Sequence, residues 1–236
     1  TFDRIPKDTA WSIERSFFPS LIERGETFVA HVHNGYWIDI GTPAKYLQVH
    51  RDIMDGRYQA PPFAGTPPGT SWVAADAKVD QGVELQGPCF IDEGVVLKSG
   101  TRVLPYAVIG RHTHVSEGAI VDGSIVWPNG WIGPEAVVRG SILGRNCHIG
   151  RNVAIEFRTA EGRLDRLPAL VADLLAHPVA VIVGNVPAAK ATKAATATVP
   201  IIFVYGGDPV KDGLVASFNH PGSNITGVTF LGGLVG

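Results

Sequence analysis

The feature that most constrains this sequence is an aliphatic residue that recurs at every sixth position. A second set of small or β-branched residues lies four positions after each member, where such side chains can point inward at a tight corner. Short fixed periods are typical of stacked repeats, in which each coil buries its apolar face only against its neighbours. The two sets are Val73, Val79, Leu85, Ile91, Leu97, Val103, Ile109, Val115 and Val121, and Ala77, Val83, Cys89, Val95, Thr101, Ala107, Thr113, Ala119 and Ile125.

The hexads predict a left-handed parallel β-helix over residues 72–153. Their register slips near Trp127-Pro128-Asn129-Gly130 and resumes from Ile132 through Ile155. At about 18 residues per three-sided coil, the segment holds roughly four to five coils. We expect this β-helix to join copies of the chain into a homo-oligomer.

The segments on either side of the repeat predict a mixed fold. Residues 1–58 have the pattern of the end of an α/β domain. The expected elements of this segment are a helix near 12–24, strands at 27–33 and 36–40, and a helix that begins at Thr42-Pro43 and ends at about Met54. The proline-rich and glycine-rich stretch 59–71 has no periodicity, which predicts a linker.

Residues 154–236 predict part of a second, parallel α/β lobe. Their apolar runs lack alternation, as in strands that are covered on both faces. The expected elements are a helix at 162–177, a strand at 179–183, a helix at 188–197, a strand at 201–205, a helix that begins at Asp208-Pro209 and a strand at 228–231.

Composition excludes several classes of partner. The net charge of −2 provides no basic surface for nucleic acid, and no apolar run approaches the ~20 residues of a membrane span. The opening residues Thr1-Phe2-Asp3-Arg4 are not a signal peptide, and they predict that the chain begins inside a longer protein. Cys89 and Cys147 are far apart in the sequence, so we expect no disulfide.

The run from His33 to Leu47 contains the string Trp37-Ile38-Asp39-Ile40-Gly41. It resembles the end of the catalytic domain of sugar-nucleotide pyrophosphorylases. With Ser12-Ile13-Glu14-Arg15, with Phe18-Pro19 and with the hexads that follow, residues 1–153 are most similar to mannose-1-phosphate guanylyltransferases.

This resemblance implies a cytoplasmic enzyme that binds a nucleotide and a sugar phosphate and makes a nucleotide sugar of the GDP-mannose type. It also implies that Asp39 helps to hold the catalytic Mg²⁺, a hard cation that offsets the charge of the phosphates. The alternative is that Asp39 caps the turn before the Pro43 helix. No Gly-x-Gly-x-x-Gly loop precedes Asp39, and no catalytic residue can be assigned. We therefore expect the chain to be inactive as it stands.

The histidines offer weaker candidates. His31 and His33 share one face of a predicted strand, where a solvated surface is the better interpretation than a metal site. His112, His114 and His148 lie in the repeat, and many hexapeptide-repeat proteins are acyltransferases with a histidine base. Because the hexads run unbroken from 73 to 121 and leave no loop to close over an acyl donor, we interpret these as surface histidines.

Residues 152–231 are similar to a different family, the substrate-binding proteins of ABC transporters. The resemblance implies a periplasmic receptor for a small solute, although the chain shows no signal peptide. In such α/β sheets, ligands bind beyond the carboxyl ends of strands, where Gly206, Gly207 and Asp208 lie. The alternative is an ordinary strand-to-helix turn with an N-cap. The strings that carry the resemblance are Asn152 to Arg158, Ala160 to Arg163, Asp165 to Pro168, Ile201 to Val204, Gly206 to Val210 and Pro221 to Val228.

The two resemblances meet at residues 150–155, a string that fits both families. This predicts a chimera of two truncated proteins, produced by a joining artefact, for instance in sequence assembly. Three functions remain open: a nucleotidyltransferase fragment, a truncated solute-binding protein, and a β-helix scaffold for oligomerisation. The predicted domains are 1–58, 59–71, 72–153 and 154–236.

Overall fold

The computed structural model describes residues 4–230 and divides the chain into two compact units, with the boundary after Trp37. The first unit contains a short helical segment that begins with Ser12, whose hydroxyl accepts a hydrogen bond from the Arg15 N–H at 3.1 Å. A π-helical turn, η2 (Ile13–Phe17), leads into α1 (Phe18–Glu23). Pro19 lies in the first turn of α1, directly after the π-helical turn.

The two strands predicted at 27–33 and 36–40 are wrong. No described residue between 24 and 41 belongs to a strand, and side chains such as Val29, Val32 and Trp37 are about four-fifths exposed. A strand needs a neighbour for its backbone N–H and C=O groups. No strand of the described chain lies beside this segment, so it stays extended without pairing.

The second unit begins with α2 (Pro43–Met54), whose bounds the sequence predicted. Thr42 is its N-cap, and the Thr42 hydroxyl accepts the Lys45 N–H at 3.3 Å. Gly56 follows the helix with a φ of +73°, the left-handed conformation in which glycine commonly ends helices. Residues 59–71 form turns without a helix or strand, and the Phe63 ring packs against Phe90 at a centroid distance of 6.1 Å.

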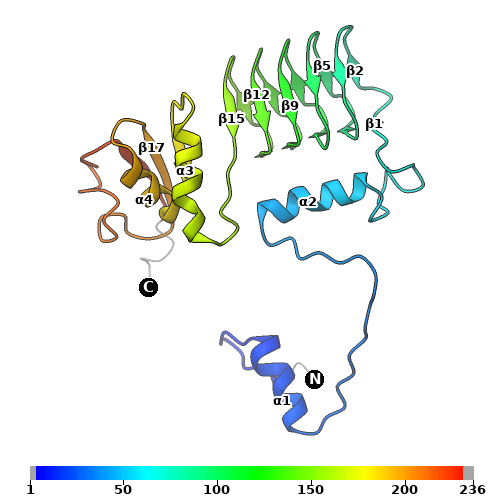
Figure 1. The fold of residues 1–236 in the computed structure, drawn as a ribbon. Coiled ribbons are helices and arrows are strands. Elements are labelled where there is room, and N and C mark those ends of the chain that lie inside the picture. The colour runs from blue at the N-terminus through cyan, green and yellow to red at the C-terminus, as the bar shows by residue number, and fades with distance from the viewer. Residues whose placement is uncertain (1–3, 231–236) are drawn as a thin grey trace. The chain divides into compact units, whose positions relative to one another are not determined.

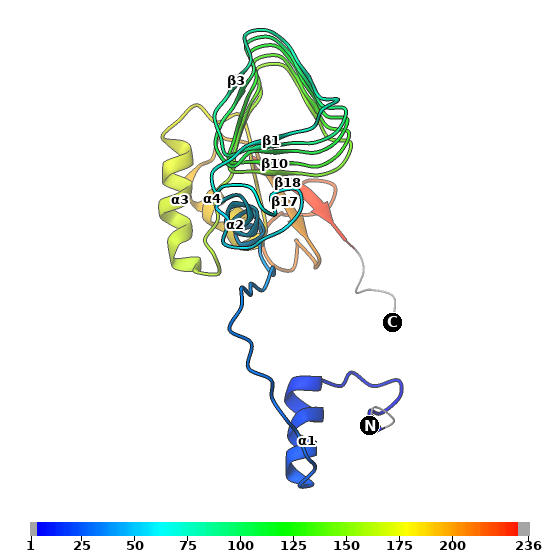
Figure 2. The same ribbon diagram turned by 90° about the vertical axis from the view of Figure 1, so that its right-hand side faces the viewer.

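The hexads form a left-handed parallel β-helix of short strands, which appear as stacked arrows in Figure 1 and as a triangle in Figure 2. Each face is a five-stranded parallel sheet. Face 1 contains β1 (Trp72–Val73), β4 (Phe90–Ile91), β7 (Val108–Ile109), β10 (Ile125–Val126) and β13 (Ile142–Leu143). Face 2 contains β2 (Lys78–Val79), β5 (Val96–Leu97), β8 (His114–Val115), β11 (Trp131–Ile132) and β14 (His148–Ile149). Face 3 contains β3 (Glu84–Leu85), β6 (Arg102–Val103), β9 (Ile120–Asp122), β12 (Val137–Arg139) and β15 (Ala154–Glu156).

Apart from Ile125, the residues of both sets point into the β-helix, and the buried ones form one continuous core. Ile125 was predicted as a corner residue, but it lies in β10, where its neighbour Val126 takes the core position. Ile91, Leu97 and Ile109 are fully buried, as are the corner residues Cys89 and Ala107. The aliphatic residues of the first coil remain more than a third exposed, because that coil has a neighbour on one side only. Cys89 and Cys147 are free thiols.

The register slip lies one corner earlier than the sequence predicted. Phe90 pairs with Val108, 18 residues on, whereas Val108 pairs with Ile125, only 17 residues on. The missing residue is lost at the corner of Asp122-Gly123-Ser124, where Gly123 has a φ of +51°. The Ser124 hydroxyl donates to the Asp122 carbonyl oxygen at 2.8 Å, which closes the shortened turn.

The last part of the second unit is a small parallel α/β segment. Its sheet has the order β16 (Ile182–Gly184), β17 (Ile201–Tyr205), β18 (Ile225–Thr229), and α4 (Val186–Ala195) packs against β16 and β17. A 3₁₀ turn, η3 (Leu164–Arg166), precedes α3 (Leu167–Leu175), which packs against α4. The parallel lobe and the strand at 201–205 are confirmed. Leu231, the last residue of the final predicted strand, lies outside the described residues.

The helix predicted from Asp208 is wrong. The chain makes one turn, in which the Asp212 N–H donates to the Asp208 carbonyl oxygen at 3.1 Å. Gly213 then adopts a φ of +72°, and the turn does not continue. The capping residue and the proline were therefore correct signals for a helical start, but the left-handed glycine stops the helix after one turn.

Candidate functional site

Asp39, the predicted metal ligand, lies three residues before the N-cap of α2. Its carboxylate is 66% exposed, and its ion-pair partner is Lys45 in the first turn of α2, at 3.9 Å. The helix cap is supplied by the Thr42 hydroxyl. The Asp39 carboxylate oxygens therefore face solvent and one ammonium group, and they are free to accept another cation.

The residues around Asp39 do not by themselves make a metal site. Mg²⁺ prefers six oxygen ligands, of which a protein usually supplies one or two carboxylates, and waters and substrate phosphates supply the rest. Between residues 4 and 230, no three histidine, cysteine, aspartate or glutamate side chains lie close enough together to hold a metal ion. Asp39 fits the role of one ligand within a larger donor set.

A mostly apolar hollow of about 310 Å³ lies directly after Asp39. It is bounded by the turn that leads into α2 on one side and by face 1 of the β-helix on the other. The Tyr46 ring meets the Trp127 ring edge-on at 6.4 Å across this region. The lining residues are Ile40, Gly41, Thr42, Pro43, Tyr46, Trp127 and Ile142.

The far end of α2 is anchored on the corner that precedes β7. The Tyr106 hydroxyl donates to the Asp55 carboxylate at 3.1 Å, and the Arg51 guanidinium lies 5.5 Å from the centre of the Tyr106 ring. The hydrogen bond to Asp55 is the largest of the effects that raise the pKa of Tyr106. Sequence reasoning missed this anchor, because nothing in a six-residue repeat marks the corner that a distant helix will touch.

Asp52 is a second polar feature of α2. Its side chain is 7% exposed, and its carboxylate accepts hydrogen bonds from the Gln48 side-chain amide at 2.8 Å and the Arg57 guanidinium at 3.0 Å. His50, on the same helix, bonds through Nδ1 to the Tyr46 carbonyl oxygen at 2.8 Å. Burial lowers the pKa of His50 and outweighs this hydrogen bond, which acts in the opposite direction.

The second predicted site, Gly206, Gly207 and Asp208, lies at the carboxyl end of β17. Here the Asp208 carboxylate accepts the backbone N–H groups of Val210 and Lys211 at 2.9 and 3.1 Å. The Gly207 carbonyl oxygen accepts the Thr229 hydroxyl at 2.6 Å. The local hydrogen bonds of the turn thus occupy an oxygen of Asp208, and Gly206 has open space beside it.

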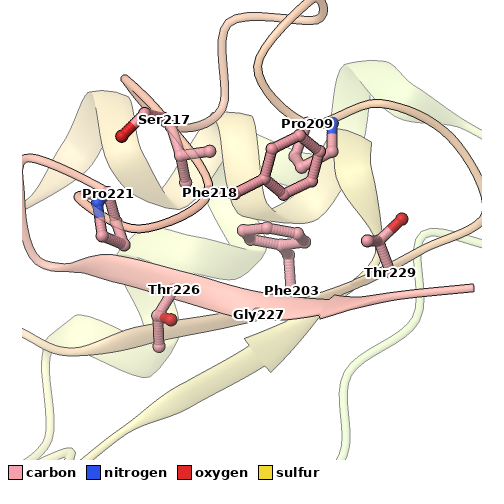
Figure 3. Close-up of a pocket in the computed structure, with 9 residues that line it drawn as sticks. Phe203, Pro209, Ser217, Phe218, Pro221, Thr226, Gly227 and Thr229 are labelled. Carbon is pink, nitrogen blue, oxygen red and sulfur yellow. The ribbon is translucent and has the colours of Figure 1, made fainter.

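A pocket of about 50 Å³ adjoins this turn, between β17, β18 and the loop that follows Pro209 (Figure 3). Phe203 lies at its base, below the ring of Phe218. Gly227 makes room for Phe203, because a Cβ at Gly227 would lie 2.5 Å from the Phe203 ring. The pocket is far smaller than the roughly 300–1,000 Å³ that a drug-sized ligand requires. Its lining residues are Phe203, Pro209, Val215, Ser217, Phe218, Pro221, Thr226, Gly227 and Thr229.

The repeat histidines differ in their environments. His112 and His148 are exposed, whereas His114 is half-buried and stacks on the Trp131 ring at 4.1 Å. Burial is the main cause that lowers the pKa of His114, and the nearby Lys98 ammonium adds to it. Trp131, which is 44% exposed, lies in register between His114 and His148 on face 2. His31 and His33 are exposed, as the sequence predicted.

Comparison with known proteins gives two partial family matches. Residues 79–164 match the GlmU-like C-terminal hexapeptide family, and residues 142–231 match the ABC transporter substrate binding protein family. Both resemblances inferred from the sequence are therefore confirmed. The two matches overlap at 142–164, around the predicted junction at 150–155. In the structure this junction is part of the last β-helix coil, where Ile155 of β15 pairs with Val138 of β12.

The chain is also similar to several sugar-nucleotide transferases. It is 26% identical over 162 residues to a UTP–glucose-1-phosphate uridylyltransferase of Synechocystis, which covers 67% of this chain and 42% of the relative. It is 32% identical over 146 residues to a probable mannose-1-phosphate guanylyltransferase of Arabidopsis thaliana, with 58% and 39% covered. A mannose-1-phosphate guanylyltransferase of Mycobacterium tuberculosis is 33% identical over 121 residues, with 51% and 33% covered. The chain thus spans between about a third and two fifths of the length of these relatives.

No helix within residues 4–230 combines the length and the apolar character needed to cross a bilayer.

Proposed function

We propose that residues 1–153 are the C-terminal part of a nucleotidyltransferase that makes a nucleotide sugar of the GDP-mannose type. The substrates are a nucleoside triphosphate and a sugar 1-phosphate, and the compartment is the cytoplasm. The observation that carries the proposal is the position of Asp39, exposed in the string Trp37-Ile38-Asp39-Ile40-Gly41 just before a helix anchored on the β-helix. The relatives named above are sugar-nucleotide transferases, which supports this reaction class.

In this proposal Asp39 supplies one carboxylate oxygen to Mg²⁺. When bound, the ion offsets negative charge as the sugar phosphate attacks the α-phosphate of the triphosphate. Lys45 pairs with Asp39 at 3.9 Å, and its ammonium group would add positive charge near a bound phosphate. The anchored α2 keeps Asp39 and Lys45 at one end of a rigid element.

We expect the 236-residue polypeptide by itself to show no nucleotidyl transfer above background with GTP, mannose 1-phosphate and Mg²⁺. One carboxylate without a phosphate-binding loop cannot organise the transition state. A coupled assay for pyrophosphate release measures this, and measurable turnover would contradict the expected inactivity.

The role of Asp39 can be tested in a chimeric enzyme. Residues 12–153 replace the corresponding part of the Mycobacterium tuberculosis relative, and activity is measured over a range of Mg²⁺ concentrations. We expect Asp39→Asn to lower kcat/KM by about 100-fold or more, because a metal ligand is lost. The matched control is Asp80→Asn, which removes an exposed carboxylate paired with Lys98 at 3.3 Å. Equal activity of the two variants would exclude the proposed role of Asp39.

We also propose that the β-helix joins copies of the chain. Face 1 is occupied by α2 and face 3 carries ion pairs such as Glu84 with Arg102 at 2.9 Å, which leaves the Trp131 row of face 2 exposed. Light scattering after size-exclusion chromatography should give an oligomer, both for the whole chain and after deletion of 157–236. A monomeric β-helix would contradict this proposal.

A second candidate function is solute binding by the C-terminal segment, which the family match over 142–231 favours. Under this proposal Gly206, Gly207 and Asp208 contact the solute. A ligand that binds only the folded state at 100 times its Kd stabilises it by about 2.7 kcal/mol. Thermal-shift screening against amino acids and small aromatic compounds tests this, and the absence of any shift would reject it.

We propose finally that the two parts were joined artificially at residues 150–155. Support comes from the overlap of the two family matches at 142–164. Amplification of the source DNA across the codons for residues 145–160 tests this proposal. A single uninterrupted product would show that the fusion is genuine.

A further inference from the structure

The chain contains two Asn-Gly steps, and the structure places them in opposite environments. Asn34-Gly35 lies in the unpaired segment before α2, and Asn129-Gly130 lies at the corner between β10 and β11. An asparagine followed by glycine is chemically vulnerable, because the next residue has no Cβ to block its backbone nitrogen from reaching the side-chain amide. Whether attack occurs then depends on how freely the backbone moves and on whether that nitrogen is already engaged.

The corner around Asn129 is locked. The backbone of Asn129 has a φ of +62°, and its side-chain amide donates to the Asn146 side-chain oxygen at 3.2 Å. The attacking atom would be the Gly130 nitrogen, which is buried and donates to the Thr113 hydroxyl at 3.3 Å. The Gly130 carbonyl oxygen is also held, because it accepts the His114 N–H at 2.9 Å. The Asn129 side chain is exposed, but its neighbouring nitrogen cannot turn toward it.

The Asn34 step has none of these restraints. Both Asn34 and Gly35 are exposed, and within residues 4–230 neither the Asn34 side chain nor the Gly35 N–H takes part in a hydrogen bond. The segment lacks helix or strand on both sides, so its dihedral angles can change without breaking secondary structure. The His33 imidazole lies beside Gly35, because a Cβ added at Gly35 would come within 2.1 Å of the His33 Nε2.

We propose that Asn34 is a site of spontaneous deamidation and that the fold protects Asn129 from the same reaction. The Gly35 nitrogen forms a bond to the side-chain amide carbon of Asn34, and the bond from that carbon to the side-chain nitrogen breaks. Ammonia leaves with the proton lost by Gly35, and a five-membered succinimide remains. Water then opens the ring at either carbonyl and gives aspartate or isoaspartate, with no oxidation or reduction at any step.

The product differs from the encoded chain in charge and in backbone length. One negative charge appears five residues before Asp39, in a segment whose other ionisable groups include His31 and His33. The isoaspartate form also adds one methylene group to the backbone. The modified side chain is the kind of group that an enzyme specific for isoaspartyl carboxylates would recognise on an exposed segment.

The test is peptide mapping by mass spectrometry after incubation of the whole 236-residue protein in mildly alkaline buffer. We expect the Asn34 peptide to gain about 1 Da at least about tenfold faster than the Asn129 peptide. In urea, where the chain is unfolded around both Asn-Gly sequences, the two deamidation rates should become similar. Equal rates in the native protein, or an unmodified Asn34 when Asn129 reacts in urea, would overturn the proposal.

A matched pair of variants separates local chemistry from folding. Gly35→Ala places a methyl group next to the attacking nitrogen, and the His33 side chain that it meets is exposed and able to move. This variant should slow the reaction at Asn34 without any change in the melting temperature. Asn34→Asp fixes the charged product, and its charge should match that of the aged protein on ion exchange. A reaction at Asn34 as fast in Gly35→Ala as in the parent chain would contradict the succinimide route.

Discussion

At the scale of single residues, the groups that respond to pH are the half-buried histidines. Burial lowers the pKa of His50 below its ordinary value of 6.5, and it does the same, together with Lys98, for His114. Between the lowered pKa and about 6.5, the unfolded chain binds more protons than the folded chain. The folded state therefore loses stability as the pH falls below about 6.5.

We expect the free energy of unfolding to decrease from about pH 7 to about pH 5, and His50→Gln to make this decrease smaller. The substitution removes an imidazole whose pKa is lowered by burial in the folded state. Urea unfolding at a series of pH values measures the effect. His31→Gln, which replaces an exposed imidazole, serves as the control for the substitution itself. An identical slope for His50→Gln and the parent chain would show that His50 does not carry the effect.

At the scale of elements, each coil of the β-helix is stabilised by the two coils beside it. Ile109 is fully buried in a central coil, whereas Leu85 is 36% exposed in the first coil, although both are inward aliphatic residues of the same repeat. The cost of truncating a side chain depends on how many neighbours surround it and on the cavity that remains. The loss of stability on truncation therefore depends on the position of the coil in the stack as well as on the residue type.

We expect Ile109→Ala to lower the free energy of unfolding by about 2–5 kcal/mol and Leu85→Ala to lower it by less than about half as much. Chemical denaturation of both variants measures this difference. Similar losses would mean that the first coil is covered in solution, for example by another copy of the chain.

The two longer helices outside the β-helix core begin with different N-caps. In α4 the Asn185 side chain accepts the Ala188 N–H at 3.2 Å, and in α2 the Thr42 hydroxyl accepts the Lys45 N–H at 3.3 Å. We expect Asn185→Ala and Thr42→Ala each to cost about 1 kcal/mol. Hydrogen exchange should show that Asn185→Ala lowers the protection of backbone amides in α4 alone, and that Thr42→Ala lowers it in α2 alone. A loss of protection that spreads to both helices from one substitution would contradict local capping.

At the scale of the whole molecule, the β-helix holds the most extensive core. Its core is continuous from Cys89 to Val138, and every strand of one coil pairs with the strand one coil away. Stability in such a stack is close to a sum over neighbouring coils. We therefore expect the β-helix to be stable without contacts from the segment after residue 156.

We expect residues 38–156 alone to unfold cooperatively, at a temperature within about 5 °C of the transition of the β-helix in the whole chain. Circular dichroism and calorimetry measure this. The control is residues 43–156, which retain α2 but lack the exposed Asp39 segment, and they should behave in the same way. A much lower transition for 38–156 would show that the C-terminal segment stabilises the coils.

Much of the fold could be predicted from the sequence wherever a signal is local. Thr42 and Pro43 mark the start of α2, the hexads mark the coils, and the apolar run at 201–205 marks β17. The strands predicted at 27–33 and 36–40 are absent. Alternating apolar residues favour a strand only where another strand can pair with its backbone, and the local sequence does not show whether one is present. The helix after Asp208 failed because the left-handed Gly213 overrides a good capping signal.

Only the position of the candidate site could be predicted in part. The place of Asp39 in front of α2 followed from the capping signal at Thr42, and its role as a metal ligand stays a prediction. The anchor of Tyr106 on Asp55 and the pocket under Phe218 were not predicted. Both depend on residues far apart in the sequence that no repeat or motif relates to one another.

The sequence by itself determined the β-helix, its six-residue period and the two family resemblances that overlap near residue 150, because each follows from patterns within a short window. The tertiary structure decided which aliphatic residues are buried, where a coil is one residue shorter, and which of the two Asn-Gly sequences is restrained by hydrogen bonds. These outcomes depend on what lies beside a residue in space. The Gly130 N–H donates to the Thr113 hydroxyl, whereas within the described residues the Gly35 N–H has no acceptor. We therefore expect the two Asn-Gly sequences to differ in their rate of deamidation.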